Sequence, residues 1–364
     1  MEKYGYRFSF GPWNIHEGAD PFGPTVRSSR TLDDKLAVYK TLGFDAVQFH
    51  DDDAVPGLDN LSPAQIRQQA QAVHRKLDGL GLIAEFVAPR LWESPMTIDG
   101  AYTSNDPKAR AYAIERSKRA ADIAQELGTD LMVLWLAREG TYMREAKDVG
   151  RATHQLLEAV NTLLDYSPKL RIAIEPKPNE PMDLAYIPTM GHALALGFQA
   201  KEPARVGVLM ESAHSILAGL DPADEIGFAL AFGKLWSVHL NDQNGLKFDQ
   251  DRAFGAVDVR RAFNQVRVLD ENRFWEVGIV GLDVKAIRTQ PAEVATKHLR
   301  NSLAMFLRLV ELSRSLDRQA VGELVTARDY EELDWLILTH LMRDRRLRTQ
   351  PPKTTQRRSA SADL

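Results

Sequence analysis

Cysteine is absent from this chain of 364 residues. The chain can therefore form no disulfide, offers no thiolate nucleophile, and has no thiolate ligand for a structural zinc site or an iron–sulfur cluster. Any metal ion must be held by carboxylate and imidazole groups.

An excess of charge of one sign and long apolar runs are missing as well. Lys and Arg number 46 and Asp and Glu number 50, so the formal net charge is −4. Such a balance gives no global field that would attract nucleic acid or an anionic membrane. No apolar run approaches the roughly 20 residues of a membrane span, and the first residues lack the apolar core of a signal peptide. We expect a cytoplasmic protein with a small-molecule ligand and no nucleic-acid or membrane partner.

Short β-branched or aromatic runs alternate with longer helical stretches along the chain. This alternation is typical of parallel strands that are joined by crossover helices. The runs predicted to be strands are Arg7–Trp13, Ala46–His50, Leu82–Ala88, Leu131–Leu136, Arg171–Glu175, Val206–Met210, Leu235–Leu240 and Val277–Val284. Eight strands of this kind predict an α/β fold, a closed TIM (β/α)8 barrel.

The helices between the strands carry recognisable boundary signals. Thr31 with Asp34 three residues later is a helix start, and Gly43 is the matching stop. Asp106 and Pro107 are a second N-cap and first helical residue.

The end of the chain does not continue the strand–helix alternation. Leu303–Leu316 is predicted as the last barrel helix, so the barrel domain covers residues 1–316. Residues 317–342 are predicted to be a helical arm that includes the amphipathic segment Tyr330–Met342. Its apolar face requires another surface, and we expect a neighbouring subunit to supply it. The basic segment 343–364 is predicted to be a disordered tail.

Polar residues recur where the predicted strands end, which is the barrel mouth where active sites are built. They are His50, Asp51, Asp52, Asp53, Glu175, Lys177, Glu211, His214, His239, Asp249, Asp251, Asp283 and Lys285. So many converging carboxylates would repel one another and take up protons unless a cation neutralised them. Oxygen ligands with one or two imidazoles suit Mg²⁺ or Mn²⁺, and also Co²⁺.

Two sets of metal ligands can be drawn from these residues. One set is Glu175, Glu211, His239 and Asp283, and the other is Glu211, His214, Asp249 and Asp251, with Glu211 bridging. A single acid at a strand end is more often a solvated residue or a helix N-cap. Independent caps would not, however, explain the Pro-rich segment around Glu175 and Lys177.

Several of these segments resemble a known family. The runs Phe49–Asp53, Ala173–Pro181 and Asp20–Gly23, and the turn Gln243–Gly245 that leads to Asp249–Asp251, are similar to xylose isomerases of the shorter, actinobacterial type. The resemblance implies a TIM barrel whose C-terminal arm wraps a neighbour in a homotetramer. It also implies two divalent cations and a metal-assisted hydride shift that interconverts an aldose and its ketose.

The resemblance also implies roles for individual residues. His50 would assist opening of the sugar ring, Asp53 would hold the His50 imidazole, and Lys177 would hydrogen-bond the carbonyl oxygen of the open chain. Phe22 would reach into the site of the adjoining subunit. The residues predicted to bind substrate are Trp13, Phe22, Arg90, Trp92, Trp135 and Lys285.

The chain departs from that family at informative positions. His239 stands where the family has an aspartate ligand, so the first set becomes two Glu, one His and one Asp, as in rhamnose isomerases and ketose 3-epimerases. Loss of one negative charge should change the metal preference. Trp92 replaces a Phe wall, while Ala88 and Arg90 replace Thr and Asn, which predicts an altered sugar pocket.

Three functions follow from these observations. The first is an aldose–ketose isomerase, which the His50–Asp53 pair, Lys177 and the second metal set favour. The second is a metal-dependent epimerase or another proton abstraction beside a carbonyl, which His239 favours. The third is a non-catalytic sugar-binding relic, in which the altered pocket no longer turns over a substrate. A retained barrel does not exclude it, because function depends on the site and not on the fold.

Overall fold

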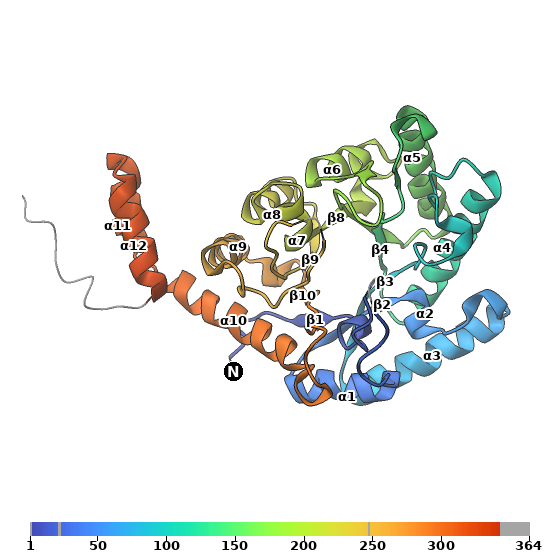
Figure 1. Cartoon of the computed structure of the whole chain (residues 1–364), viewed down its shortest axis with the longest axis horizontal. Helices are drawn as coiled ribbons and strands as arrows, with labels where there is room; N and C mark the ends of the chain where they lie inside the picture. Colours follow the sequence, from blue (N-terminus) through green and yellow to red (C-terminus); the bar gives the residue numbers. More distant parts are fainter. Residues whose placement is uncertain (1, 21–22, 247, 343–364) are drawn as a thin grey trace, which may run out of the picture. The chain divides into compact units, whose positions relative to one another are not determined.

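A computed structural model describes residues 2–20, 23–246 and 248–342. Eight parallel strands close into a barrel in the order β1-β10-β9-β8-β6-β4-β3-β2, with helices around it (Figure 1). The barrel strands are β1 (Phe8–Phe10), β2 (Ala46–His50), β3 (Ile83–Ala88), β4 (Leu131–Trp135), β6 (Arg171–Glu175), β8 (Val206–Glu211), β9 (Leu235–His239) and β10 (Ile279–Leu282). The predicted TIM barrel fold is confirmed.

Helices connect these strands along the outside of the barrel. They are α1 (Leu32–Leu42), α2 (Asp51–Ala54), α3 (Pro63–Leu80), α4 (Pro107–Glu126), α5 (Val149–Tyr166), α6 (Met190–Gln199), α7 (Ser212–Leu217), α8 (Pro222–Ala231), α9 (Val259–Glu271) and α10 (Lys297–Arg314). A small antiparallel pair, β5 (Gly140–Thr141) with β7 (Leu184–Ala185), joins the loops that follow β4 and β6.

The predicted helix boundaries are found where the capping residues placed them. The Thr31 hydroxyl accepts a hydrogen bond from the backbone N–H of Asp34, and the Asp34 carboxylate accepts one from the backbone N–H of Thr31. Gly43 ends α1 in the left-handed conformation at a φ of 78°. The Asp106 side chain caps α4 by accepting from the backbone N–H of Lys108. These local bonds satisfy backbone groups that a helix end otherwise leaves without partners.

The barrel has a register irregularity between β2 and β3. Val47 pairs with Ala84 and Gln48 pairs with Phe86, so Glu85 is an extra residue on β3 without a partner on β2. A bulge of this kind bends the strand and redirects a side chain. Glu85 is buried as a result.

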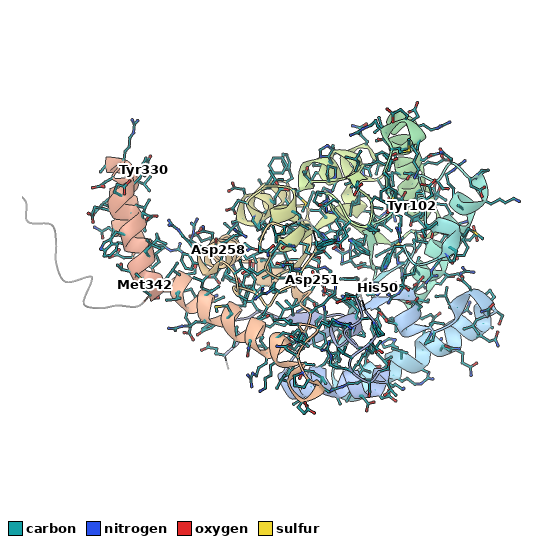
Figure 2. All side chains as sticks on the ribbon, in the orientation of Figure 1. His50, Tyr102, Asp251, Asp258, Tyr330 and Met342 are labelled. Carbon is teal, nitrogen blue, oxygen red and sulfur yellow. The ribbon has the colours of Figure 1, made fainter. Side chains whose placement is uncertain are left out.

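Apolar side chains fill part of the barrel interior. Buried residues of β3, β4, β6 and β8 form one cluster, and Trp13 packs against it. The cluster consists of Phe86, Ala88, Leu131, Val133, Ala173 and Leu209. Figure 2 shows His50 and Asp251 near the middle of the barrel, where the strands converge.

The chain divides into two compact units, of which the first ends at Leu309 and the second begins at Val310. Within the second unit, the segment Tyr330–Met342 is helix α12, with the predicted bounds. Helix α11 (Arg318–Ala327) precedes it and was not predicted as a separate helix. His340 donates from Nε2 to the backbone carbonyl of Leu312 over 2.8 Å.

The predicted tail 343–364 lies outside the described residues. Among the residues that the structure describes, no helix combines the length and the apolar character that a membrane crossing requires.

Candidate active site

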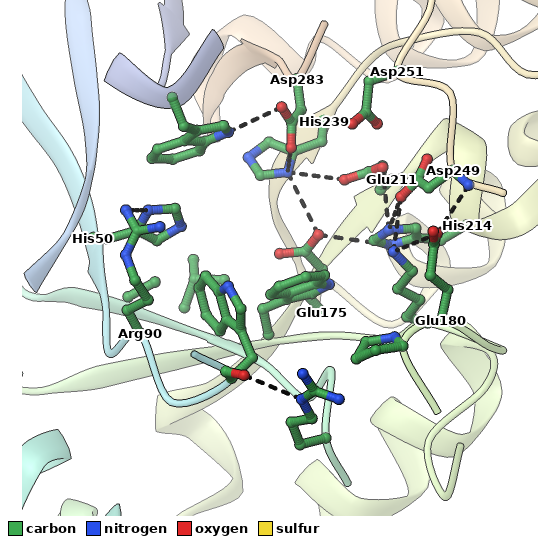
Figure 3. A pocket seen from close by; sticks show the side chains of 18 of the residues that line it. His50, Arg90, Glu175, Glu180, Glu211, His214, His239, Asp249, Asp251 and Asp283 are labelled. Carbon is green, nitrogen blue, oxygen red and sulfur yellow. Dashed lines mark hydrogen bonds and ion pairs between the residues drawn. The ribbon is translucent and has the colours of Figure 1, made fainter. Parts of the chain in front are cut away.

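A cavity of about 460 Å³ opens at the carboxyl ends of the barrel strands (Figure 3). Most residues predicted to act on a ligand line it. These are Trp13, His50, Arg90, Trp92, Trp135, Glu175, Lys177, Glu211, His214, His239, Asp249, Asp251, Asp283 and Lys285. Asp53 lies behind His50 and does not line the cavity, and Phe22 lies outside the described residues.

The four residues of the first predicted ligand set come together from the ends of neighbouring strands. His239 Nδ1, at the end of β9, lies 3.2 Å from Glu211 Oε2 and 3.5 Å from Glu175 Oε1. The same nitrogen is 3.9 Å from Asp283 Oδ2, directly after β10. Three carboxylates thus surround one imidazole nitrogen, and Glu211, His239 and Asp283 have ligand atoms close enough to share one ion.

The second predicted set meets around His214 in α7. His214 Nε2 lies 3.2 Å from Glu211 Oε1 and 3.1 Å from Asp249 Oδ2. Glu211, Asp249 and Asp251 also have ligand atoms within 4.8 Å of one another. Figure 3 shows how Glu211 joins the imidazoles of His214 and His239. Glu211 therefore lies between the two imidazoles, and its predicted role as a bridging ligand stays a prediction.

Charge and hydrogen bonding at this cluster both fit a bound cation. Burial raises the pKa of Glu211 to about 8, and burial together with Asp249 raises the pKa of Asp251 well above its usual range. These acids require a positive charge beside them to stay ionised. Among the described residues, Asp249 Oδ1 and His214 Nδ1 are buried without a hydrogen-bond partner. Carboxylate oxygens and imidazole nitrogens are ligands of Mg²⁺, Mn²⁺ and Co²⁺.

Two lysines compensate part of the negative charge. Lys177 Nζ lies 2.9 Å from Asp249 Oδ2 and 5.0 Å from the centre of the Trp135 ring. Burial disfavours the Lys177 ammonium, but Asp249 and Glu180 outweigh it and raise the pKa of Lys177. Lys285 forms an ion pair with Asp251. Asp251 itself has a φ of 44°, a left-handed conformation that is costly for a residue other than glycine and that clusters at functional sites.

His50 has two neighbours at the ring nitrogen that faces away from the cavity. Its Nδ1 lies 3.1 Å from Asp53 Oδ2, as the resemblance implies, and 2.7 Å from Arg90 Nη2. Arg90 also contacts Asp52 through Nε at 2.7 Å. A guanidinium group only donates hydrogen bonds, so the short Arg90 contact makes His50 Nδ1 an acceptor and places the ring proton on Nε2. Arg90 is thus the hydrogen-bond partner of His50 Nδ1 in this arrangement, and the Asp53 carboxylate, which only accepts, lies beside the same nitrogen.

Aromatic rings form one wall of the cavity. The Trp13 ring stacks on His50 with centroids 4.1 Å apart, and Trp92 meets His50 edge-on at 4.9 Å. Trp92 and Trp135 also meet edge-on, at 4.4 Å. These rings give the cavity an apolar wall between His50 and Lys177.

Several polar groups at the cavity were not singled out from the sequence. Arg138, Glu180 and Glu93 line it. Arg138 lies two residues after the predicted strand Leu131–Leu136, so its position after a barrel strand was an available signal. Asn14 donates to the Asp283 carboxylate, as does Trp13 Nε1 over 3.0 Å. Both residues lie in the short 3₁₀ helix Pro12–Asn14 that comes after β1.

Comparison with known proteins gives the same assignment as the motifs. The model of a family described as xylose isomerase-like TIM barrel matches residues 36–302. The chain is similar to the xylose isomerase of Thermus thermophilus, with 35% identity over 334 residues, which cover 89% of this chain and 84% of that protein.

Solved structures share the fold at lower identity. The apo form of the 3-keto-D-glucoside 4-epimerase of E. coli has a TM-score of 0.58 at 14% identity, over 83% of this chain and 99% of that one. An L-ribulose 3-epimerase has a TM-score of 0.59 at 17% identity, over 89% and 99% of the two chains. The IOLI protein with a bound zinc atom has a TM-score of 0.59 at 15% identity, over 84% and 98%. At these identities the likeness extends to the barrel fold alone.

Proposed function

The chain belongs to the xylose isomerase-like TIM barrel family, and on that premise we propose that it is a divalent-metal-dependent enzyme that interconverts an aldose and its ketose. One observation carries the proposal. Three groups of residues that could hold a metal ion all include Glu211, and they line a single cavity together with Lys177 and His50.

The ligands fall into two groups around Glu211. The proposed ligands are Glu175, Glu211, His239 and Asp283 for one cation, and Glu211, His214, Asp249 and Asp251 for a second. Bound cations would supply Lewis-acid polarisation of a carbonyl oxygen and a neighbouring hydroxyl oxygen of the substrate. The remaining steps depend on this chain's own side chains.

Lys177 holds the substrate carbonyl in this scheme. Its ammonium is fixed between Asp249 and the face of Trp135, and it donates a hydrogen bond to the carbonyl oxygen of the open-chain sugar. Trp92 and Trp135 exclude water from the reacting carbons. A hydride can then move from C2 to C1 without exchange for a solvent proton, while the C2 hydroxyl group loses its proton and the former carbonyl oxygen gains one.

A metal-dependent epimerisation is the second candidate, and the contact between Arg90 and His50 favours it. With Nδ1 accepting from Arg90, His50 keeps its ring proton on Nε2 and cannot accept a proton there. This arrangement suits a substrate that enters in its open-chain form. Buried carboxylates such as Glu211 would then move a proton beside the carbonyl.

Isotope transfer tests the proposal. The protein is loaded with Mg²⁺, Mn²⁺ or Co²⁺ and incubated with aldopentoses and aldohexoses that carry deuterium at C2. A hydride shift leaves the deuterium on C1 of the ketose, whereas carboxylate-mediated proton transfer loses it to water. We expect a ketose product that retains the label.

The His50→Ala variant is the matched control. It should keep its metal affinity, because His50 belongs to neither ligand set, and lose turnover of cyclic sugars. Ketoses that carry deuterium at C3, beside the carbonyl, test the second candidate, and their conversion to the epimer with loss of the label would support it. No metal binding by titration calorimetry at millimolar Mg²⁺, Mn²⁺ or Co²⁺, with no conversion of any sugar, would overturn both in favour of a sugar-binding relic.

A further inference from the structure

Beneath the proposed metal ligands lies a layer of buried polar side chains that neither sequence motif nor mechanism accounts for. It consists of Ser9 on β1, Gln48 on β2, Glu85 on β3 and Ser237 on β9. All four are buried, and Glu85 brings a carboxylate into the interior of the barrel. Burial of a carboxylate costs free energy unless hydrogen bonds or a paired charge compensate it.

Both oxygens of the Glu85 carboxylate accept hydrogen bonds from the other residues of the layer. Ser9 donates its hydroxyl proton to Glu85 Oε2, and Ser237 donates to Glu85 Oε1 over 2.7 Å. Gln48 Nε2 lies 3.1 Å from Glu85 Oε2 and 3.1 Å from the Ser9 hydroxyl oxygen. Ser9 uses its single proton on Glu85, so it accepts from Gln48.

These bonds fix which way the Gln48 amide faces. Its NH₂ group must face Glu85 and Ser9, because the reversed amide would place its oxygen against a carboxylate oxygen. Its oxygen, Oε1, then lies 3.1 Å from His239 Nε2 and accepts the proton of that nitrogen. The other ring nitrogen of His239, Nδ1, faces Glu211, Glu175 and Asp283.

The backbone around this layer is shaped to accommodate it. The bulge between β2 and β3 places Glu85 out of register beside Gln48. Gly281 pairs with His239 across β10 and β9, and a Cβ at Gly281 would lie 2.3 Å from Gln48 Nε2 and 3.1 Å from His239 Cδ2. A side chain at position 281 would therefore displace the amide from His239.

We propose that Gln48 and Glu85 are positioning residues that hold the His239 imidazole with Nδ1 toward the carboxylate cluster, as a metal ligand whose other nitrogen carries the proton. The proposal rests on the metal site of the proposed function. An imidazole ligand needs a partner that fixes its tautomer and ring orientation, and loss of such a partner typically weakens metal binding about 10–100-fold. An aspartate ligand has no tautomer, so a chain with Asp at position 239 does not need the Gln48 amide.

The test is a double-mutant cycle on metal affinity. Mn²⁺ binding is measured by titration calorimetry for the parent, Gln48→Met, His239→Asp and the double variant. Met has a similar length and no amide. We expect Gln48→Met to weaken Mn²⁺ binding about 10–100-fold when His239 is present, and by less than about threefold when Asp replaces it.

A purely structural role for Gln48 would reduce affinity equally in both backgrounds, and that result overturns the positioning role while it leaves the proposed function standing. Failure of the parent to bind Mn²⁺ would overturn the metal site and this proposal together. Glu85→Gln repeats the test if Gln48→Met does not fold, and we expect a smaller loss that again requires His239.

A spectroscopic measurement separates orientation from folding. In the Mg²⁺-loaded protein with ¹⁵N-labelled histidine, we expect His239 to show a protonated Nε2 and an unprotonated Nδ1. In Gln48→Met this pattern should be lost or mixed. A pattern unchanged by the substitution would overturn the role of the Gln48 amide.

Discussion

Individual residues decide how this barrel differs from the xylose isomerases that it resembles. His239 brings an imidazole into a ligand set that otherwise consists of carboxylates, and Arg90 brings a guanidinium group to the imidazole of His50. In each imidazole one ring nitrogen contacts a polar neighbour, Gln48 for His239 and Arg90 for His50, and such a contact sets which nitrogen carries the proton. The chemistry of both histidines therefore depends on these polar neighbours.

Arg90 gives the first prediction at this scale. In Arg90→Asn, His50 Nδ1 loses its guanidinium donor and donates to Asp53 instead, which leaves Nε2 free to accept a proton. We expect the ¹⁵N signals of His50 to show the exchanged tautomer. Turnover of cyclic aldoses should rise by up to about 10²-fold, the lower end of what a positioned general base contributes.

The control for Arg90 is the same substitution in a His50→Ala background, where activity should not rise. An Arg90→Asn protein with an unchanged His50 tautomer would show that Asp53 already holds the ring in the parent. Metal affinity should be unaffected in each variant, because Arg90 and His50 are outside both ligand sets.

His298 gives a second prediction, on stability. Burial lowers the pKa of His298 to about 4, and its Nε2 donates to the backbone carbonyl of Asn14 over 3.1 Å. The unfolded chain has a His pKa near 6.5. Between these values the unfolded state binds a proton that the folded state does not, so stability is complete above about pH 6.5 and falls as the pH drops toward 4.

The matched variant is His298→Gln, which keeps a side-chain N–H for Asn14 and removes the titration. Urea unfolding at pH 7 and pH 4.5 should show that the parent loses about 2 kcal/mol more than the variant between the two pH values. An identical loss for the two proteins would assign the acid sensitivity to other groups.

At the scale of strands and helices, most of the fold and much of the site could be predicted from the sequence. Strand β2 matches its predicted bounds, and β8 extends one residue further, to include Glu211. Parallel strands in a barrel bring their carboxyl ends to one mouth, so residues at those ends converge whatever their distance in the chain. The position of Glu211 between two sets followed from this rule alone.

The polar layer below the mouth could not be predicted in the same way. Glu85 is a charged residue in the middle of the apolar run of β3, which was a visible signal. Its direction depends on the bulge opposite Gln48, however, and a register shift has no mark in the alternation of side chains. The Arg90 contact with His50 likewise depends on the path of the loop after β3, which short-range patterns do not determine.

At the scale of the whole molecule, the arm bears on assembly. The sequence predicts that residues 317–342 pack on a neighbouring subunit, and Val325, Tyr330 and Trp335 of α11 and α12 are exposed in the chain alone. We propose a homo-oligomer, dimer or tetramer, that these helices hold together.

A chain that stops after Leu316 should sediment as a smaller species than the full chain. Its Mn²⁺ affinity should be retained, because every proposed ligand precedes Leu316. Trp335→Glu should shift assembly in the same direction without truncation, since burying a carboxylate in an apolar contact is costly. A full chain that sediments as a monomer at micromolar concentration would contradict this role of the arm, and the predicted contribution of Phe22 to a neighbouring site with it.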